Sequence, residues 1–173
     1  SGREARDTRG DMVRVAVSVL LPARNAGRYL RSAVADLLGQ RGVEFEVVAV
    51  DDGSSDGTGE ALERAARADA RLRVVRTGAV GPAQALDLAL SAARHPFIGQ
   101  MEADDRCPPD RFARLLAALE LHSDWDGAVS RAELFGFRSD GMRRYLDWQN
   151  RLLEPEALAQ YEECLARYPK AWN

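Results

Sequence analysis

Long apolar runs are missing from the sequence, and none approaches the ~20 residues that a membrane-spanning helix needs. Cysteine is scarce: only Cys107 and Cys164 occur among 173 residues, so a disulfide framework is not expected and a reducing compartment fits better. Neither sign of charge dominates, because the formal net charge is only −3, which argues against a dedicated nucleic-acid binder. These absences favour a cytoplasmic globular protein without a membrane span, and leave open a peripheral place at the inner face of the membrane.

Two common phosphate-binding motifs are absent as well. The sequence contains neither the G-x-G-x-x-G fingerprint of dinucleotide-binding domains nor the lysine-bearing loop of P-loop nucleotidases. A Rossmann dehydrogenase and a P-loop ATPase are therefore disfavoured. What is present is the profile of an ordinary globular domain, with 46% apolar and 29% charged residues in a chain of single-domain length.

Apolar runs rich in β-branched residues alternate with amphipathic segments. Strands are expected at 13–21, 45–50, 72–75 and 97–101. The first should end at Pro22, which lacks an amide hydrogen for the sheet. Helices are expected between and after the strands, carrying apolar residues at Leu30, Ala33, Val34, Leu37 and Leu38, at Ala61, Leu62, Ala65 and Ala66, at Leu86, Leu88, Ala89 and Leu90, and at Phe112, Leu115, Leu116 and Leu119. This alternation predicts an α/β fold, a three-layer αβα sandwich with a mostly parallel, Rossmann-like sheet.

The chain should have three parts. Residues 1–11 are expected to form a disordered leader, residues 12–139 the main domain, and residues 140–173 a C-terminal helical extension. Near the boundary we expect an extra strand at 133–138 and a turn at Asp140-Gly141. Helices are expected at 142–153 and 155–168. The second of these carries an apolar stripe, which suggests packing against another surface, including self-association.

A cluster of acidic residues follows the fourth expected strand. Glu102, Asp104 and Asp105 place several carboxylates at one strand end, where like charges raise each other's pKa unless a cation joins them. A hard divalent cation with oxygen ligands meets that need, and magnesium often uses one or two carboxylates together with substrate phosphates. The alternative is that these residues cap the next helix or pair with Arg106 and Arg111.

The ends of the first two strands offer further polar groups. Asp51 and Asp52 follow the second strand, where an aspartate can accept hydrogen bonds from a base or ribose, and Gly53 permits a tight turn. The alternative is a loop, Asp51–Asp56, that merely caps the following helix through Asp56 or Thr58. After the first strand, the segment from Pro22 to Gly27 offers helix-terminal amides to an anion. Arg24 could add a charge-assisted contact there.

Three segments occur in this order: VSVLLPARNAGRYLRSAV, FEVVAVDDGSSDGT and HPFIGQMEADDRCPPDRF. Together they resemble the nucleotide-sugar half of a family 2 glycosyltransferase with the GT-A fold, from about Val15 to Phe112. The resemblance implies a nucleotide-sugar site lined by Pro22, Ala23, Arg24, Asn25, Asp51, Asp52, Gly53 and Asp104, with Asp52 at the base. It also places Glu102, Ala103 and Asp104 in the D-x-D motif. Glu102, Asp104 and Asp105 would then hold Mg²⁺ or Mn²⁺.

The resemblance implies an inverting, metal-dependent transfer of sugar from a nucleotide-diphosphate sugar to a hydroxyl of a saccharide, lipid-linked or protein acceptor. The sequence departs from the family pattern at Glu102, where aspartate is usual, and at Asp87 and Ala89, where asparagine and glycine are usual. No Asp or Glu after residue 128 stands in the context of a catalytic base, so the base is unassigned. Two alternatives stay open: a nucleotidyltransferase, which would need a glycine-rich basic loop, and a catalytically incomplete module that binds a nucleotide or a partner.

Overall fold

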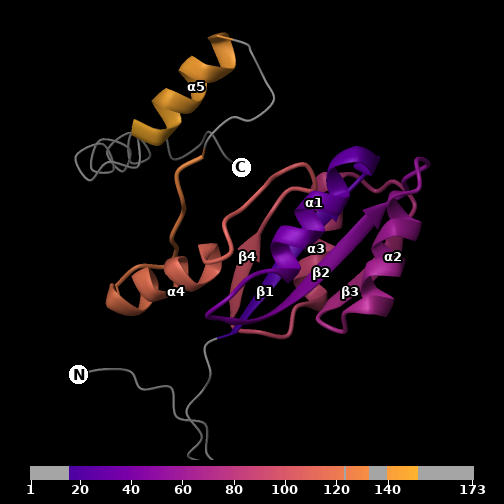
Figure 1. Ribbon diagram of the computed structural model, residues 1–173, viewed down its shortest axis with the longest axis horizontal. Helices are drawn as coiled ribbons and strands as arrows, with labels where there is room; N and C mark the ends of the chain where they lie inside the picture. The colour runs from indigo at the N-terminus through magenta and orange to yellow at the C-terminus, as the bar shows by residue number, and fades with distance from the viewer. Residues whose placement is uncertain (1–15, 123, 133–139, 152–173) are drawn as a thin grey trace, which may run out of the picture. The chain divides into compact units, whose positions relative to one another are not determined.

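The computed structural model describes residues 16–122, 124–132 and 140–151 (Figure 1). In chain order the elements are β1 (Ala16–Ala23), α1 (Gly27–Leu38), β2 (Glu44–Asp52), α2 (Thr58–Ala68), β3 (Leu72–Thr77), α3 (Pro82–Ala92), β4 (Phe97–Gln100), α4 (Arg111–Leu121) and α5 (Asp140–Arg151). The chain divides into two compact units between Ala128 and Val129, so all four strands belong to the first unit.

The strands form one sheet in the order β3-β2-β1-β4, and every neighbouring pair is parallel. Parallel neighbours need crossover connections, and α1, α2 and α3 supply them. Helices lie on both sides of the sheet, with α1 in front and α3 behind in Figure 1. The predicted three-layer α/β sandwich with a parallel sheet is therefore confirmed.

Side chains of β1 and β2 alternate between two cores. Odd-numbered residues such as Val19 and Val47 pack with apolar residues of α1, α2 and α4. Even-numbered residues such as Leu20 and Val48 pack with Ala85 of α3 and its neighbours. Because both faces are covered, both strands read as continuous apolar runs in the sequence.

Three strands end later than the sequence predicted, β1 at Ala23, β2 at Asp52 and β3 at Thr77. β1 continues through Pro22 to Ala23, in register with Val50 and Asp51 of β2. Pro22 is tolerated because β4 pairs with β1 only as far as Leu20, so no ladder bond on that side needs a proline amide. β2 likewise continues through Asp52, which the sequence had placed in a loop.

The helices carry the expected apolar stripes with small differences. In α1, Leu30, Ala33, Val34 and Leu37 are buried. Helix α4 begins at Arg111, and only Phe112 and Leu116 of its predicted stripe are buried. The partial exposure of Leu115 and Leu119 follows from the place of α4 at the β4 edge of the sheet (Figure 1), where it has less core to cover.

In the second unit, α5 begins at Asp140, so Asp140 and Gly141 form its first turn rather than the predicted separate turn. The Asn150 side chain donates to the Ala132 carbonyl at 2.7 Å and accepts from the Ala132 amide at 2.9 Å. The predicted leader at 1–11, strand at 133–138 and helix at 155–168 lie outside the described residues. Among the described helices, none has the length and apolar character required to cross a membrane.

A buried polar cluster fastens the C-terminal end of α3 to the sheet. The Glu46 carboxylate accepts from the Ser18 hydroxyl at 2.7 Å, the Arg94 amide at 2.8 Å and the Arg73 guanidinium at 2.9 Å. Burial opposes ionisation of Glu46, but these hydrogen bonds outweigh it and lower the pKa of its carboxyl group below the ordinary value. Ionised Glu46 is therefore the form that the cluster stabilises.

We predict that Glu46→Gln lowers the free energy of unfolding at neutral pH by about 2 kcal/mol, because the cluster loses its negative charge and one of its two acceptor oxygens. Since the folded pKa is depressed, the stabilisation is complete above the unfolded pKa and disappears as pH falls through the folded pKa. Denaturant unfolding at a series of pH values should therefore show the difference from wild type shrinking in acid. The exposed neighbour Glu44 provides the control, Glu44→Gln; a difference that stays constant with pH would contradict the prediction.

Candidate functional site

The strand order reverses beside β1, because the chain first moves from β1 to β2 and β3 and then crosses back to β4. In open α/β sheets, ligands bind at such a switch point, outside the carboxyl ends of the strands. A pocket of about 450 Å³ lies there. Its lining residues come from the ends of β1, β2 and β4 and from the start of α3: Pro22, Ala23, Arg24, Asp52, Pro82, Ala83, Ala85, Leu86, Gln100 and Glu102.

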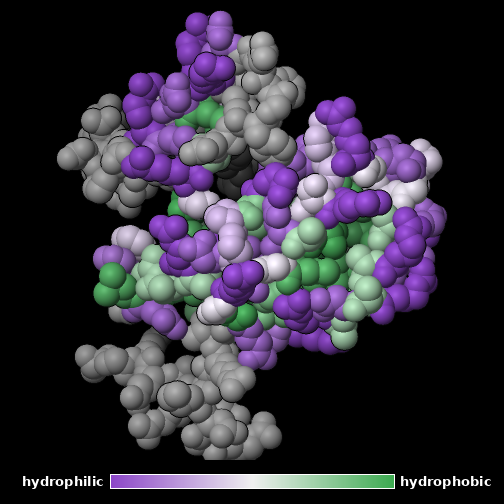
Figure 2. All heavy atoms as spheres, viewed as in Figure 1, coloured by the Kyte–Doolittle hydropathy of each residue, from purple (hydrophilic) through white to green (hydrophobic). Residues whose placement is uncertain are grey.

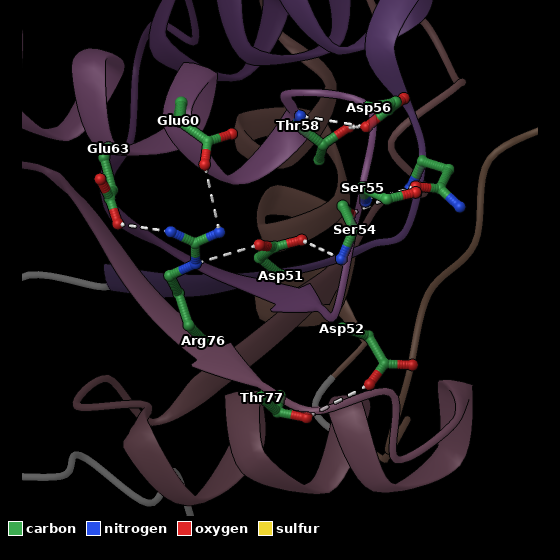
Figure 3. A network of polar contacts seen from close by, with 11 residues as sticks. Asp51, Asp52, Ser54, Ser55, Asp56, Thr58, Glu60, Glu63, Arg76 and Thr77 are labelled. Atoms are coloured by element: carbon green, nitrogen blue, oxygen red, sulfur yellow. Dashed lines mark hydrogen bonds and ion pairs between the residues drawn. The ribbon is translucent and has the colours of Figure 1, made fainter.

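Asp52 is the buried carboxylate of this pocket, with 3% of the residue exposed. Its oxygens accept from the amides of Val80 and Gly81, at 2.6 and 3.0 Å, and from the Thr77 hydroxyl at 3.3 Å. These donors lie at the end of β3 and in the loop before α3, so Asp52 fixes the wall of the pocket that α3 provides. Figure 3 shows its bond to Thr77.

Arg24 brings a positive charge to the pocket. Its Nη1 lies 3.8 Å from Oδ2 of Asp52, and half of its side chain is exposed. An exposed guanidinium beside a fixed carboxylate can turn toward an anionic ligand without leaving a buried charge unpaired.

Asp51 is not among the residues that line this pocket, and its place in the nucleotide-sugar site stays a prediction. Successive side chains of a strand point to opposite faces, so Asp51 points toward α2 while Asp52 points toward α3. The Asp51 carboxylate accepts from Arg76 Nε and from the Ser54 amide, both at 3.2 Å. Arg76 also pairs with Glu60 and Glu63 of α2 (Figure 3), so Asp51 belongs to a structural ion network.

The predicted anion site at the start of α1 is corrected, because the loop after β2 already occupies its amides. Ser54 Oγ accepts from the Asn25 amide at 3.0 Å, Thr58 Oγ1 from the Ala26 amide at 2.9 Å, and Asp56 Oδ2 from the Gly27 amide at 2.9 Å. The Asn25 side chain completes this clasp by accepting from the Ser55 amide at 2.9 Å. Asn25 therefore helps to hold the two loops together and does not line the pocket, and its contact with a nucleotide sugar stays a prediction.

The loop after β2 also departs from the predicted helix cap. The N-cap of α2 is Gly57, whose φ of 86° suits glycine, rather than Asp56 or Thr58. Asp56 instead accepts from the Thr58 amide at 3.1 Å and from the Thr58 hydroxyl at 2.7 Å. One carboxylate thus bonds to the first residue of α2 and to the first residue of α1, and the two loops are held together.

Gly53 does not line the pocket, but its backbone allows the end of β2 to approach the loop after β3. Its φ is 67°, and a Cβ added there would lie 2.6 Å from the Ala79 amide nitrogen. Because that loop donates to Asp52, the absence of a side chain at Gly53 helps to shape the pocket wall.

We predict that Gly53→Ala lowers the free energy of unfolding by about 2 kcal/mol, since it combines left-handed strain with a backbone clash. Urea unfolding of the variant measures this loss. Gly78→Ala is the matched control, because a Cβ there would meet nothing within 4 Å and surface changes of that kind stay within about 0.5 kcal/mol. Equal effects of the two substitutions would show that the close approach has no energetic weight.

The acidic residues after β4 occupy a turn closed by a hydrogen bond of 3.2 Å from the Asp105 amide to the Glu102 carbonyl. Ala103 is buried in the core, so Glu102, Asp104 and Asp105 project outward. Glu102 lines the pocket and accepts from Gln100 Nε2 at 2.9 Å. Burial and the negative charge of Asp104 raise the pKa of the Asp105 carboxyl group, while Arg111 opposes them.

The described residues contain no preformed group of three His, Cys, Asp or Glu side chains that could hold a metal ion. The expected triad of Glu102, Asp104 and Asp105 is therefore not assembled as a complete set of ligands. The donor chemistry nevertheless fits a hard cation, because all three side chains offer carboxylate oxygens within one turn. Magnesium is commonly bound by one or two carboxylates and completed by phosphate oxygens and water.

A second groove, of about 460 Å³, lies between α1 and α2, where apolar residues show in Figure 2. Leu30, Val34, Ala61 and Ala65 line it, with Arg31 and Arg64. This groove is separate from the pocket at the strand ends, because neither Asp52 nor the acidic turn lines it.

Sequence reasoning missed the α3 side of the pocket. Pro82, Ala83, Ala85 and Leu86 give the pocket an apolar wall. The usable signal was the opening of a helix at Gly81-Pro82 directly after a strand, since that junction lies at the same sheet edge as the other strand ends. Gln100, the last residue of β4, was missed although it directly precedes the acidic segment.

The profile of Glycosyl transferase family 2 matches residues 18–162. Among curated relatives, the uncharacterized glycosyltransferase EpsJ of Bacillus subtilis (strain 168) is 33% identical over 104 residues, which cover 60% of this chain and 30% of EpsJ. Chondroitin synthase of Pasteurella multocida (strain Pm70) is 35% identical over 94 residues, covering 54% of this chain and 10% of the synthase.

Solved structures show the same similarity. S. aureus TarS 1-349 in complex with UDP-GlcNAc superposes with a TM-score of 0.57 and 29% identity, covering 62% of this chain and 32% of that protein. The mannosyltransferase PcManGT from Pyrobaculum calidifontis, in complex with GDP-Man and Mn²⁺, gives a TM-score of 0.56 and 30% identity over 60% and 32% of the two chains. These neighbours are GT-A glycosyltransferases, and the chain spans less than a third of each.

Proposed function

Because the chain belongs to glycosyl transferase family 2, we propose that it binds a nucleotide-diphosphate sugar in the pocket beside β1 and supports an inverting, metal-dependent transfer to an acceptor hydroxyl. One observation carries this proposal: the ends of three strands bring Arg24, Asp52 and Glu102 to one pocket at the switch point of the sheet. The complexes of TarS with UDP-GlcNAc and of PcManGT with GDP-Man and Mn²⁺ support the class of ligand.

The nucleoside would lie between the polar strand ends and the apolar start of α3. Pro82 and Leu86 offer flat apolar contact for a base, and Arg24 faces them from the end of β1. An ionised carboxylate has about four acceptor sites. The three hydrogen bonds to Asp52 therefore leave it able to accept one more from a base or ribose.

The diphosphate would lie at the acidic turn after β4. Asp104 and Asp105 would hold Mg²⁺ or Mn²⁺ there, with Glu102 at the pocket end of the turn. When bound, such a cation neutralises the charge that develops on the departing diphosphate. The three protein carboxylates would orient the donor, and Arg24 would add a direct charge toward the phosphates.

The acceptor side of the reaction has no residues assigned to it. The chain spans 30% of EpsJ and 10% of chondroitin synthase, so the activity of a whole protein of this kind is part of the proposal. We propose that the acceptor is a hydroxyl of a saccharide, lipid-linked or protein substrate, and the catalytic base is unassigned. We also propose a cytoplasmic location, with which the buried free thiol of Cys107 agrees.

Isothermal titration calorimetry with UDP and GDP, each with and without Mn²⁺, tests donor binding. We expect Mn²⁺ to strengthen binding of at least one nucleotide, because the acidic turn gains a cation that bridges to the diphosphate. Asp104→Ala and Asp105→Ala should each remove this Mn²⁺-dependent gain. Asp126→Ala, at an exposed carboxylate outside the turn, should keep it; the same gain in all variants would place the metal elsewhere.

A second candidate is a module that binds the nucleotide sugar without turning it over, because no carboxylate is assigned as the catalytic base that a transfer needs. Incubation with UDP-GlcNAc or GDP-mannose and Mn²⁺ separates the two candidates. Slow metal-dependent release of free nucleotide diphosphate, measured by chromatography, is expected of the transferase, because water can replace the acceptor. Binding without release would support the module, and Asp104→Ala serves as the blank for non-enzymatic hydrolysis.

A further inference from the structure

The acidic turn continues into a segment that is fastened to the C-terminal end of α1. The Asp36 carboxylate accepts from Arg106 Nε at 2.5 Å and Nη2 at 3.0 Å, a two-pronged ion pair. It also accepts from the Cys107 amide at 3.1 Å. Both donors follow directly after Asp105, so Asp36 holds the chain where it leaves the turn.

Gln40, buried with 6% of the residue exposed, fixes the next part of the segment. Its Nε2 donates to the Pro108 carbonyl at 2.7 Å, and its Oε1 accepts from the Phe112 amide at 3.3 Å. The Arg41 amide donates to the Pro109 carbonyl at 2.7 Å. The backbone between the turn and α4 therefore has its own anchor, independent of the Arg106 side chain.

Unlike this backbone anchor, the ion pair between Asp36 and Arg106 determines where the positive charge of Arg106 lies. Arg106 adjoins Asp105 in the sequence, and an arginine so placed could neutralise the carboxylates of the turn. Asp36 instead draws the guanidinium toward α1. Within the described residues, the Asp104 carboxylate accepts no hydrogen bond and keeps its acceptor sites for a ligand, whereas the Asp105 carboxylate accepts one from the Glu102 amide and is attracted by the positive charge of Arg111.

We infer that Asp36 is a positioning residue for the metal and diphosphate end of the donor site, keeping Arg106 away from Asp104 and Asp105. This inference rests on the proposed function. Loss of the Asp36 charge would free Arg106 to compete with a divalent cation for the same oxygens. Replacing a residue that orients metal ligands without binding the metal itself commonly changes the metal affinity by about 10- to 100-fold.

The test is calorimetry of UDP and GDP binding to the full chain, with Mn²⁺ and without it. Asp36→Asn keeps the shape and can still accept from the Cys107 amide, but it loses the charge that holds Arg106. We expect the Mn²⁺-dependent affinity to fall about tenfold, while the affinity of the nucleotide without metal stays unchanged. Adding Arg106→Ala to Asp36→Asn should restore the Mn²⁺-dependent affinity to that of Arg106→Ala alone, because the competing cation is gone.

Asp69→Asn is the matched control. Asp69 and Arg71 form a similar two-pronged pair, at 2.7 and 3.0 Å, away from the site. This variant should match the stability loss of Asp36→Asn in thermal unfolding and leave nucleotide binding intact. Failure of the double variant to recover, or equal loss with and without metal, would overturn the inference. Wild type that binds no nucleotide with Mn²⁺ would overturn the proposed function itself, and the inference with it.

Discussion

The alternation of side chains along β2 is the constraint on which the site depends. Two consecutive aspartates end this strand, and the extended backbone sends their carboxylates to opposite faces. Asp51 meets Arg76 and helps to hold α2, whereas Asp52 meets the loop before α3 and lines the pocket. A shift of β2 by one residue would turn Asp51 toward α3 and Asp52 toward α2. Neither carboxylate would then face its present partners.

The loops after β1 and β2 are held in place by contacts with each other at the same edge of the sheet. The loops after β1 and β2 bind each other through Asn25, Ser54 and Asp56, so the amides at the start of α1 serve the fold. Those contacts hold the chain just after Arg24, which leaves this one side chain exposed beside the pocket. Most polar groups at the edge therefore support the pocket, and few line it.

The sequence was sufficient to predict the strand and helix order, since each strand is an apolar run and each helix has a stripe of period 3.6. It also placed Pro22, Asp52 and Glu102 at one edge, because the carboxyl ends of parallel strands meet there. It did not predict that β2 continues to Asp52, because that depends on pairing with Arg76 and Thr77 of β3, which are distant in sequence. The role of Asn25 was hidden for the same reason: its partners lie in another loop.

The two acidic regions at this edge of the sheet differ in how their charge is compensated. Asp52 is buried, and three donors of the fold satisfy it, so its position is set before any ligand binds. Asp104 and Asp105 are exposed, and the nearest arginine in the sequence is turned toward Asp36. A fixed carboxylate suits recognition of a neutral hydrogen-bond donor, whereas exposed carboxylates suit a cation that arrives with its anion. The division of charge along one sheet edge thus matches a ligand with a neutral base at one end and a metal-bound diphosphate at the other.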